Sequence, residues 1–478
     1  MKKFLACILL ALTVVCAIPF NAATAETQSG EDVYSSIDAY LSQATQRAHI
    51  PATSVTIVDK ESVLLSKTYG KCGSADVPFL LGSVSKSFTA VCIMQLVENG
   101  KINLDDNISA YLPTAKYGAK ITVKQLLNHT SGLGEHQNFN NYKILNKQGE
   151  HVYANVNYTL LGKIIEAVSG TDYGTYVTQN VFKPLNMTRS AASREESEKN
   201  GLIQGYRNYL GVNTAAKPSY PKSDSDWISL SAGYLSASTN DLGKYLQMYL
   251  NEGNEIISQQ SIDAMFYDNN VSVEANIPYA YGFGWNLIKE PLNEPVLRHS
   301  GLVETGMSCI YILPERQIGI AIAVNVNDYF VTKDMMDRID WSIALMLMGE
   351  APNEIGASEY AVKHFGYDMA YIAVLIIACL PLCLLGLFIK RLSKGNLALK
   401  TVITVLLHLV LPSLLLALSQ MFFATPLWVA CNFVPDLFIT IVISSILLYA
   451  GGIAKAAIRI FYTVKKRRNK NDLQTAVY

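Results

Sequence analysis

The sequence predicts a mixed α/β unit, of α+β class, followed by three transmembrane helices. Half of the 478 residues are apolar and only 16% are charged, which is high for a soluble protein and ordinary for one that carries membrane helices. The apolar excess is concentrated at the two ends of the chain. The region between them mixes helical and strand-like patterns, so we interpret it as one globular unit.

The N-terminus has the pattern of a secretory signal peptide. Lys2 and Lys3 precede an apolar run over residues 4–18, and Ala23 and Ala25 supply small residues at a cleavage site. We expect residues 1–25 to be removed. The alternative is an uncleaved anchor helix, but the run is shorter than the ~20 residues that a membrane span needs.

Residues 26–352 carry the elements of the globular unit. We expect helices over residues 33–49, 83–99, 155–169, 241–251 and 333–347, and strands over residues 54–59, 63–68, 283–288, 307–312 and 318–325. The helix at 83–99 is apolar on most of its faces, which predicts that it lies buried in the middle of the unit. Residues 353–366 are expected to form a linker.

Three apolar stretches follow, over residues 367–389, 401–423 and 437–458. Each is long enough to cross a hydrocarbon core of ~30 Å. We therefore expect a transmembrane region over residues 367–459 and a tail over residues 460–478, with the lipid bilayer as a partner of this region.

Positive charge is distributed unevenly between these stretches. Four basic residues lie between the first and second stretches, and seven lie at the end of the third stretch or after it: Lys390, Arg391, Lys394 and Lys400, then Lys455, Arg459, Lys465, Lys466, Arg467, Arg468 and Lys470. The connection over residues 424–436 contains no Lys or Arg. Because basic loops stay in the cytoplasm, we expect a cytoplasmic tail and an extracytoplasmic globular unit in a multi-pass membrane protein.

Charge and cysteine content argue against several other classes of function. Lys plus Arg and Asp plus Glu are 39 each, so nothing in the charge balance indicates a nucleic-acid partner. Outside the apolar ends, the cysteines are Cys72, Cys92 and Cys309, whose spacing fits no metal motif. We expect these three to be buried thiols, and we expect no metal.

Ser83 and Lys86 form the first candidate catalytic pair. They are three residues apart at the start of the apolar helix, so they share a helix face and the amine can reach the hydroxyl. The helix N-terminus favours an anion that develops at Ser83. Burial of Lys86 disfavours its charged form and lets it act as a base.

Tyr153 and Asn155 form the second candidate element, just before the helix at 155–169. A tyrosine beside a lysine can be held partly as phenolate and can move the serine proton. The Asn155 amide offers a donor and an acceptor to a substrate. Alternatively, Tyr153 is an ordinary half-buried tyrosine and Asn155 a helix cap.

The third element is His299-Ser300-Gly301, which we place just before a strand. A glycine here would let a substrate pair along the strand edge. The backbone N–H of Leu302, together with that of Ser83, would then form an oxyanion hole.

In this order and spacing, the three elements resemble the serine β-lactamase and penicillin-binding protein superfamily, in its class C-like branch. The stretches LGSVSKSFTAVCIMQLVENGKINLDD, ITVKQLLNHTSGL and YANVNYTLLGKIIEAVSG are similar too. The resemblance covers about residues 31–350. It implies an antiparallel sheet flanked by helices, with a helical subdomain inserted after the Ser83 helix. It also implies acylation of Ser83 followed by hydrolysis, without a cofactor.

One departure from the family pattern concerns the substrate. Many family members have Lys-Thr-Gly where this chain has His299-Ser300-Gly301, and the family lysine meets a substrate carboxylate. Histidine is at best partly charged near neutral pH. The pattern therefore favours hydrolysis of small D-amino-acid peptides, amides or esters of the cell envelope over efficient β-lactam hydrolysis.

Two alternative functions remain open. The layout of a hydrolase followed by three membrane helices resembles the peptidases that remove an acyl-D-asparagine cap from colibactin-like prodrugs. Those enzymes share an acidic residue where this chain has Leu80 and a serine where it has Asn155. The second alternative is a penicillin-binding sensor that is acylated without turnover.

Overall fold

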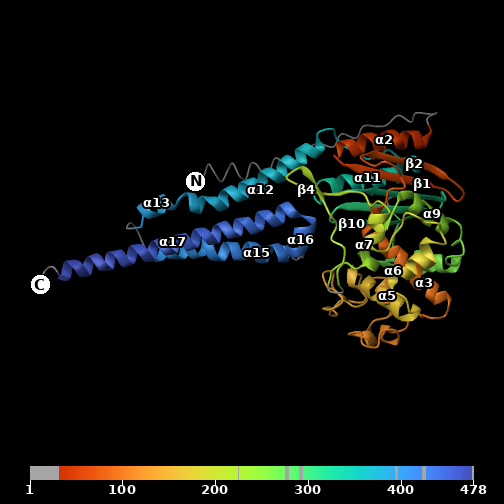
Figure 1. The fold of residues 1–478 in the computed structure, drawn as a ribbon, viewed down its shortest axis with the longest axis horizontal. Helices are drawn as coiled ribbons and strands as arrows, with labels where there is room; N and C mark the ends of the chain where they lie inside the picture. The colour runs from red at the N-terminus through yellow and green to blue at the C-terminus, as the bar shows by residue number, and fades with distance from the viewer. Residues whose placement is uncertain are drawn as a thin grey trace. The chain divides into compact units, whose positions relative to one another are not determined.

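The computed structural model describes residues 32–223, 226–274, 279–289, 294–392, 397–422 and 427–475. The expected signal peptide, residues 1–25, lies outside this range. The chain divides into two compact units, a globular one that ends at Tyr360 and a helical one that begins at Ala361 and also takes in Tyr209–Gly211. Figure 1 shows the elements of both units.

An eight-stranded sheet forms the centre of the globular unit, in the order β2-β1-β12-β11-β10-β9-β8-β7. Its strands are β1 (Ala52–Val58), β2 (Val63–Gly70), β7 (Val271–Ser272), β8 (Tyr279–Gly282), β9 (Trp285–Ile288), β10 (Val296–Val303), β11 (Gly306–Leu313) and β12 (Ile318–Val324). Every neighbouring pair is antiparallel. The expected antiparallel sheet is therefore confirmed.

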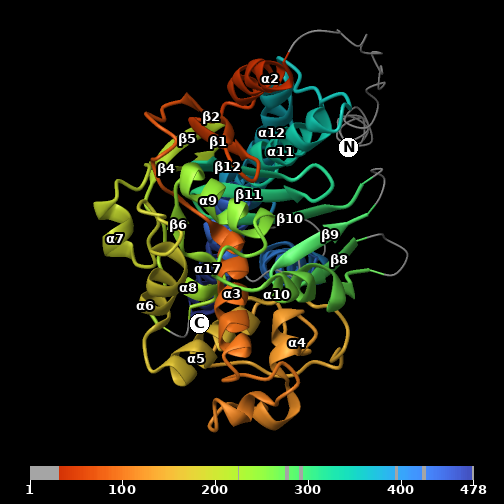
Figure 2. The same ribbon diagram turned by 90° about the vertical axis from the view of Figure 1, so that its right-hand side faces the viewer.

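Helices cover both faces of this sheet (Figure 2). On one face, α2 (Val33–Arg47) and α11 (Thr332–Leu347) pack against one core; on the other, α3 (Ser85–Glu98) and α9 (Thr239–Leu250) pack against a second. Strand β11 is buried along its whole length because its side chains pack alternately into the two cores. Tyr311 packs into the first core and Ile310 into the second.

A helical subdomain lies between α3 and the late strands of the sheet, as the family resemblance implies. Its longest helix is α5 (Asn155–Ser169), and the shorter ones are α4 (Val123–Leu127), α6 (Tyr173–Val177), α7 (Arg194–Lys199), α8 (Leu230–Gly233) and α10 (Gln259–Asp263). Two small sheets join β3 (Phe79–Leu80) to β6 (Ser236–Ala237), and β13 (Val326–Asn327) to β4 (Gly205–Tyr209) and β5 (Val212–Ala216). Helix α3 is buried along most of its length, as its apolar faces predict.

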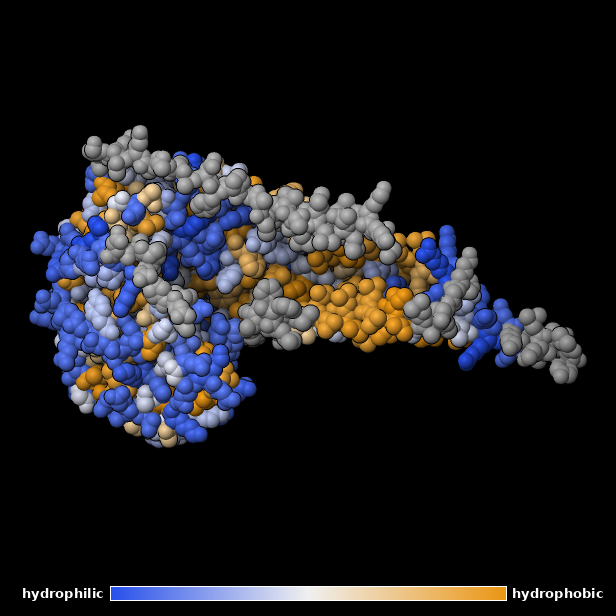
Figure 3. All heavy atoms as spheres, turned by 180° about the vertical axis from the view of Figure 1, so that it is seen from behind, coloured by the Kyte–Doolittle hydropathy of each residue, from blue (hydrophilic) through white to orange (hydrophobic). Residues whose placement is uncertain are grey.

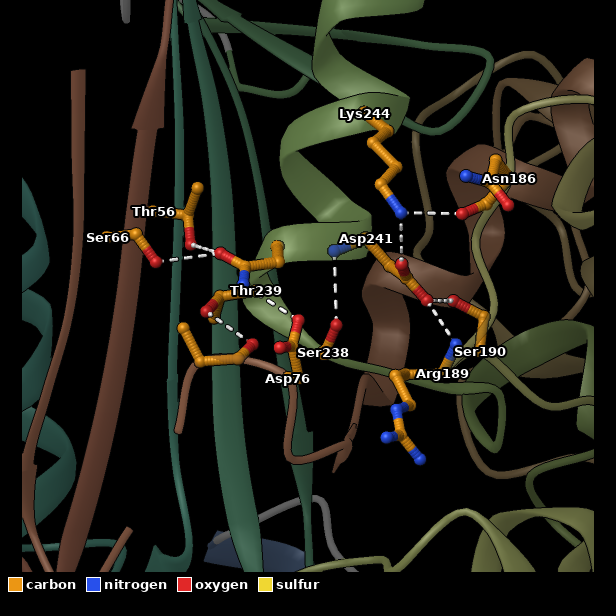
Figure 4. A network of polar contacts seen from close by, with 12 residues as sticks. Thr56, Ser66, Asp76, Asn186, Arg189, Ser190, Ser238, Thr239, Asp241 and Lys244 are labelled. Atoms are coloured by element: carbon orange, nitrogen blue, oxygen red, sulfur yellow. Dashed lines mark hydrogen bonds and ion pairs between the residues drawn. The ribbon is translucent and has the colours of Figure 1, made fainter. Parts of the chain in front are cut away.

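Polar contacts fix the start of α9 (Figure 4). The buried carboxylate of Asp241 accepts hydrogen bonds from the Arg189 N–H at 2.7 Å and the Ser190 hydroxyl at 3.0 Å. Lys244 donates to the other oxygen at 3.1 Å. A buried carboxylate with this many partners holds the helix against the neighbouring loop.

The second unit consists of apolar helices. They are α12 (Glu359–Cys383), α13 (Leu385–Lys390), α14 (Leu397–Val405), the π-helical turn η7 (Leu406–Val410), α15 (Leu411–Phe422), α16 (Leu427–Phe433) and α17 (Pro435–Thr475). Among the residues that the structure describes, three segments are long and apolar enough to cross a membrane: Glu359–Cys383, Lys400–Ala417 and Pro435–Asn469. Figure 3 shows their hydrophobic surface in orange. The first begins within the segment expected to be a linker.

Candidate active site

Ser83 lies in a single 3₁₀ turn, η2 (Gly82–Val84), that leads directly into α3. Lys86 is one turn further on, and its Nζ lies 2.9 Å from the Ser83 Oγ. The i,i+3 spacing therefore brings the hydroxyl and the amine into hydrogen-bond contact, as the sequence predicts.

Lys86 is fully buried, and its amine has two further partners. Nζ lies 2.8 Å from the Asn155 Oδ1 and 2.7 Å from the Ala232 carbonyl oxygen. Burial holds the pKa of Lys86 well below its usual range. All three oxygens accept hydrogen bonds from the Lys86 amine, which is thereby held against the Ser83 Oγ.

Tyr153 lies in the segment just before α5. Its ring centroid is 4.9 Å from the Lys86 Nζ, and it lines the same cavity as Ser83. Burial raises the pKa of Tyr153 well above its usual value. The loss of solvation therefore disfavours the expected phenolate character of Tyr153.

Asn155 is the first residue of α5, and the residue at the N-cap is Ala154. The helix-cap alternative for Asn155 is therefore wrong. Its Oδ1 accepts from Lys86, so this oxygen orients the amine.

His299, Ser300 and Gly301 lie inside strand β10, not before a strand as expected. The sequence did not predict strand β10 because polar residues interrupt its apolar pattern. Strand β10 pairs with β9 only from Val296 to Arg298. The edge of β10 that follows is therefore free of β9, and Ser300 and Leu302 line the cavity that contains Ser83.

Two glycines allow β10 and η2 to approach closely. A Cβ at Gly301 would lie 1.9 Å from the Leu81 carbonyl oxygen, and one at Gly82 would lie 2.4 Å from the Leu302 nitrogen. Gly82 also has a φ of +51°. Because η2 and β10 approach closely, the backbone amides of Ser83 and Leu302 lie near each other. An oxyanion hole requires two such neighbouring amides.

His299 is 3% exposed and makes two polar contacts. Its Nδ1 lies 2.8 Å from the Ser300 carbonyl oxygen, and its Nε2 lies 3.4 Å from the Tyr281 hydroxyl. Burial, and to a smaller extent Lys86, lowers the pKa of His299 to about 3. The imidazole is therefore neutral at physiological pH.

Ser83, Tyr153 and His299 line one cavity of about 370 Å³. It is lined by Ser83, His151, Tyr153, Val273, Tyr279, Tyr281, Asn286, His299, Ser300 and Leu302. None of these described lining residues is Asp, Glu, Lys or Arg, and burial lowers the pKa of His151 to about 4. The described part of the cavity wall therefore contains no Asp, Glu, Lys or Arg and is rich in tyrosine.

Five of the lining residues were missed from the sequence: His151, Val273, Tyr279, Tyr281 and Asn286. Only His151 had a local signal. Alternate side chains of an extended segment share one side, so His151 accompanies Tyr153. The others come from β7 to β9 and the turn after β7, which no local pattern connects to Ser83.

The described residues contain no group of three or more His, Cys, Asp or Glu that could hold a metal ion. Cys72, Cys92 and Cys309 are free and buried, as expected. Burial raises the pKa of all three thiols.

Comparisons with known proteins agree with this geometry. The Beta-lactamase family matches residues 37–344. "Protein flp" of Staphylococcus aureus (strain N315) is 30% identical over 342 residues, which cover 64% of this chain and 66% of that protein. "Teichoic acid D-alanine hydrolase" of the same species is 32% identical over 199 residues, 37% of this chain and 49% of that protein.

Solved structures share the fold. The octameric penicillin-binding protein homologue from Pyrococcus abyssi has a TM-score of 0.59 at 27% identity, over 69% of this chain and 80% of that one. The D-amino acid amidase from Ochrobactrum anthropi SV3 has a TM-score of 0.54 at 20% identity, over 65% of this chain and 98% of that one.

Proposed function

Because the chain belongs to the beta-lactamase family of serine hydrolases, we propose that it hydrolyses D-amino-acid esters or amides through an acyl-enzyme on Ser83. The observation that carries this proposal is the set of three oxygens around the Lys86 Nζ. When the amine is neutral, its two N–H groups can go to the Asn155 and Ala232 oxygens, and its lone pair can accept the Ser83 hydrogen.

In the acylation step, Lys86 takes the Ser83 proton while the Oγ forms a bond to the substrate carbonyl carbon. The amides of Ser83 and Leu302 stabilise the negative charge on the carbonyl oxygen. The bond to the leaving group breaks, and the protonated Tyr153 donates its proton to the departing oxygen or nitrogen. Tyr153 then recovers a proton from the Lys86 ammonium group, which returns both residues to their starting state.

In the deacylation step, water attacks the acyl carbon and gives one proton to Lys86. The bond to the Ser83 Oγ breaks, and that proton returns to the serine. The sum of both steps is ester or amide plus water giving acid plus alcohol or amine. No cofactor is needed for this balance.

Two related proteins support the class of substrate. One relative is a teichoic acid D-alanine hydrolase, and one fold neighbour is a D-amino acid amidase. None of the described lining residues is Lys or Arg, and a D-aminoacyl ester has no carboxylate that needs a cationic partner.

We expect a D-alanyl ester to be hydrolysed at least about 10-fold faster than its L-alanyl counterpart, since one pocket contact worth ~1.4 kcal/mol gives this ratio. The measurement is kcat/KM for matched D- and L-alanyl esters of one alcohol. Acylation of Ser83 by a fluorescent β-lactam without turnover of any ester would support the sensor alternative instead. Release of an acyl-D-asparagine cap, with no D-alanyl ester cleaved, would support the prodrug peptidase.

We further propose that the helical unit anchors the enzyme in a membrane with the globular unit outside the cytoplasm. Reporter fusions test this: one placed after Ile389 should be active only as a cytoplasmic reporter, and one near Thr425 only as an extracytoplasmic reporter, because the basic residues flank the cytoplasmic ends. The reverse pattern would place the globular unit in the cytoplasm and contradict the proposed envelope substrate.

A further inference from the structure

We propose that His129 is a positioning residue, whose Nδ1 acceptor holds Tyr153 in place for its part in acylation. This inference rests on the proposed function, in which Tyr153 gives its proton to the leaving group. His129 belongs to the stretch ITVKQLLNHTSGL and has no exposed surface. It is not among the described residues that line the cavity, so it can affect the substrate only through other residues.

His129 contacts the segment before α5 at three points. Its carbonyl oxygen accepts a hydrogen bond from the Val152 N–H at 2.8 Å, and its Nδ1 lies 3.2 Å from the Ala154 nitrogen. Its ring also packs against the Tyr153 ring, with 4.3 Å between the two centroids. Both backbone amides that flank Tyr153 are therefore bound to one residue, and the tyrosine ring between them lies against the ring of that residue.

The neighbouring hydrogen bonds show that Nδ1 of His129 is an acceptor. The Leu133 N–H donates to the Ser131 Oγ at 3.2 Å, and that hydroxyl donates to the Asn157 Oδ1 at 2.6 Å. The Nδ2 of the same amide lies 2.9 Å from the His129 Nδ1. Because this N–H group and the Ala154 N–H can only donate, Nδ1 carries no hydrogen and accepts from both. Burial lowers the pKa of His129 well below its usual value, which keeps the ring neutral.

The backbone of His129 suggests which substitutions isolate this acceptor. Its φ is +58°, in the left-handed region that Gly and Asn adopt readily. His129→Asn keeps an acceptor near the position of Nδ1, because the Oδ1 of asparagine is also two bonds from Cβ. His129→Gly removes the acceptor. Neither substitution strains the backbone, so they form a matched pair.

Two D-alanyl esters test the inference with the full chain. The alcohol of the ethyl ester must be protonated as it departs, whereas the 4-nitrophenyl ester releases a stable anion. His129→Gly should lower kcat/KM for the ethyl ester by about 10²-fold, since a displacement of about 1 Å can have this effect, and leave that for the 4-nitrophenyl ester nearly unchanged. His129→Asn should keep both values near those of the parent. An equal loss for the two esters in His129→Gly, or the same selective loss in both variants, would overturn the proposal.

Tyr153→Phe is the reference variant, because it removes the hydroxyl that His129 is proposed to place. It should cause the same selective loss for the ethyl ester. Addition of His129→Gly to it should cause little further loss, because the two residues act as one unit. Labelling of Ser83 by a fluorophosphonate shows that each variant is folded. Losses that add in the double variant would contradict the proposal.

A failure of the proposed function can be told apart from a failure of this inference. If Ser83 is labelled but neither ester is hydrolysed, the proposed function is wrong. The rates of labelling by a fluorescent β-lactam and by the fluorophosphonate then replace the two esters, because the nitrogen of the opened lactam takes up a proton and the departing fluoride needs none. Slower labelling by the β-lactam alone in His129→Gly, restored in His129→Asn, would still support the positioning role. Equal effects on both rates would refute it.

Discussion

Replacement of Ser83 by alanine should lower kcat by about 10⁴-fold or more, because the acyl-enzyme has no other oxygen on which to form. The hydroxyl lies at the start of α3 and contacts Lys86 at 2.9 Å, so its loss should change the free energy of unfolding by about 1 kcal/mol or less. The measurements are single-turnover hydrolysis of a D-alanyl ester and thermal unfolding of the full chain.

Ser85→Ala is the matched control. Ser85 is buried two residues away, and its hydroxyl accepts from the Leu235 N–H at 3.2 Å. This variant should be less stable and yet keep covalent labelling at Ser83. Labelling of Ser85 or Ser131 in the Ser83→Ala variant would show that the nucleophile was assigned wrongly.

Replacement of Lys86 by methionine should lower kcat by about 10²–10⁴-fold, the usual worth of a general base. Methionine has a similar length and leaves Ser83 in place, so a fluorophosphonate should still label the serine, but slowly. Lys86→Arg is the matched control, because its side chain stays charged at every accessible pH. It should be as inactive as the methionine variant if the neutral amine is the base.

The Lys86→Met variant should also differ from the parent in how its stability depends on pH. The pKa of Lys86 is lowered in the folded protein, so between that value and the ordinary lysine value the unfolded chain binds one more proton. The stability that Lys86 contributes is therefore fully present above its pKa in the unfolded chain. It is lost as the pH falls through its lower pKa in the folded protein. Relative to Lys86→Met, the parent should gain stability from pH 7 to pH 10, by at most about 1.4 kcal/mol per pH unit.

Thermal unfolding of both proteins at pH 7, 8, 9 and 10 measures this difference, because titration of all other groups cancels in the comparison. A difference that does not change with pH would mean that Lys86 stays charged when folded. The assignment of Lys86 as the base would then have to be given up.

Local patterns determined much of this protein from the sequence alone. Helix α5 has the bounds expected from its apolar spacing, residues 155–169. The contact of Lys86 with Ser83 follows from i,i+3 geometry on one turn. The three long apolar segments follow from composition. Each of these features depends on residues close together in the chain, which is why the sequence contains it.

Tertiary structure alone decided the chemistry of the other site residues. Strand β10 is defined by its pairing with β11 and β9, so the sequence placed His299 outside a strand. The raised pKa of Tyr153 comes from its burial in the folded protein. The tautomer of His129 comes from the hydrogen bonds that Ala154 and Asn157 donate to it in the folded protein. Solvation and proton positions depend on which atoms surround a group in three dimensions, and no spacing of residues along the chain contains that information.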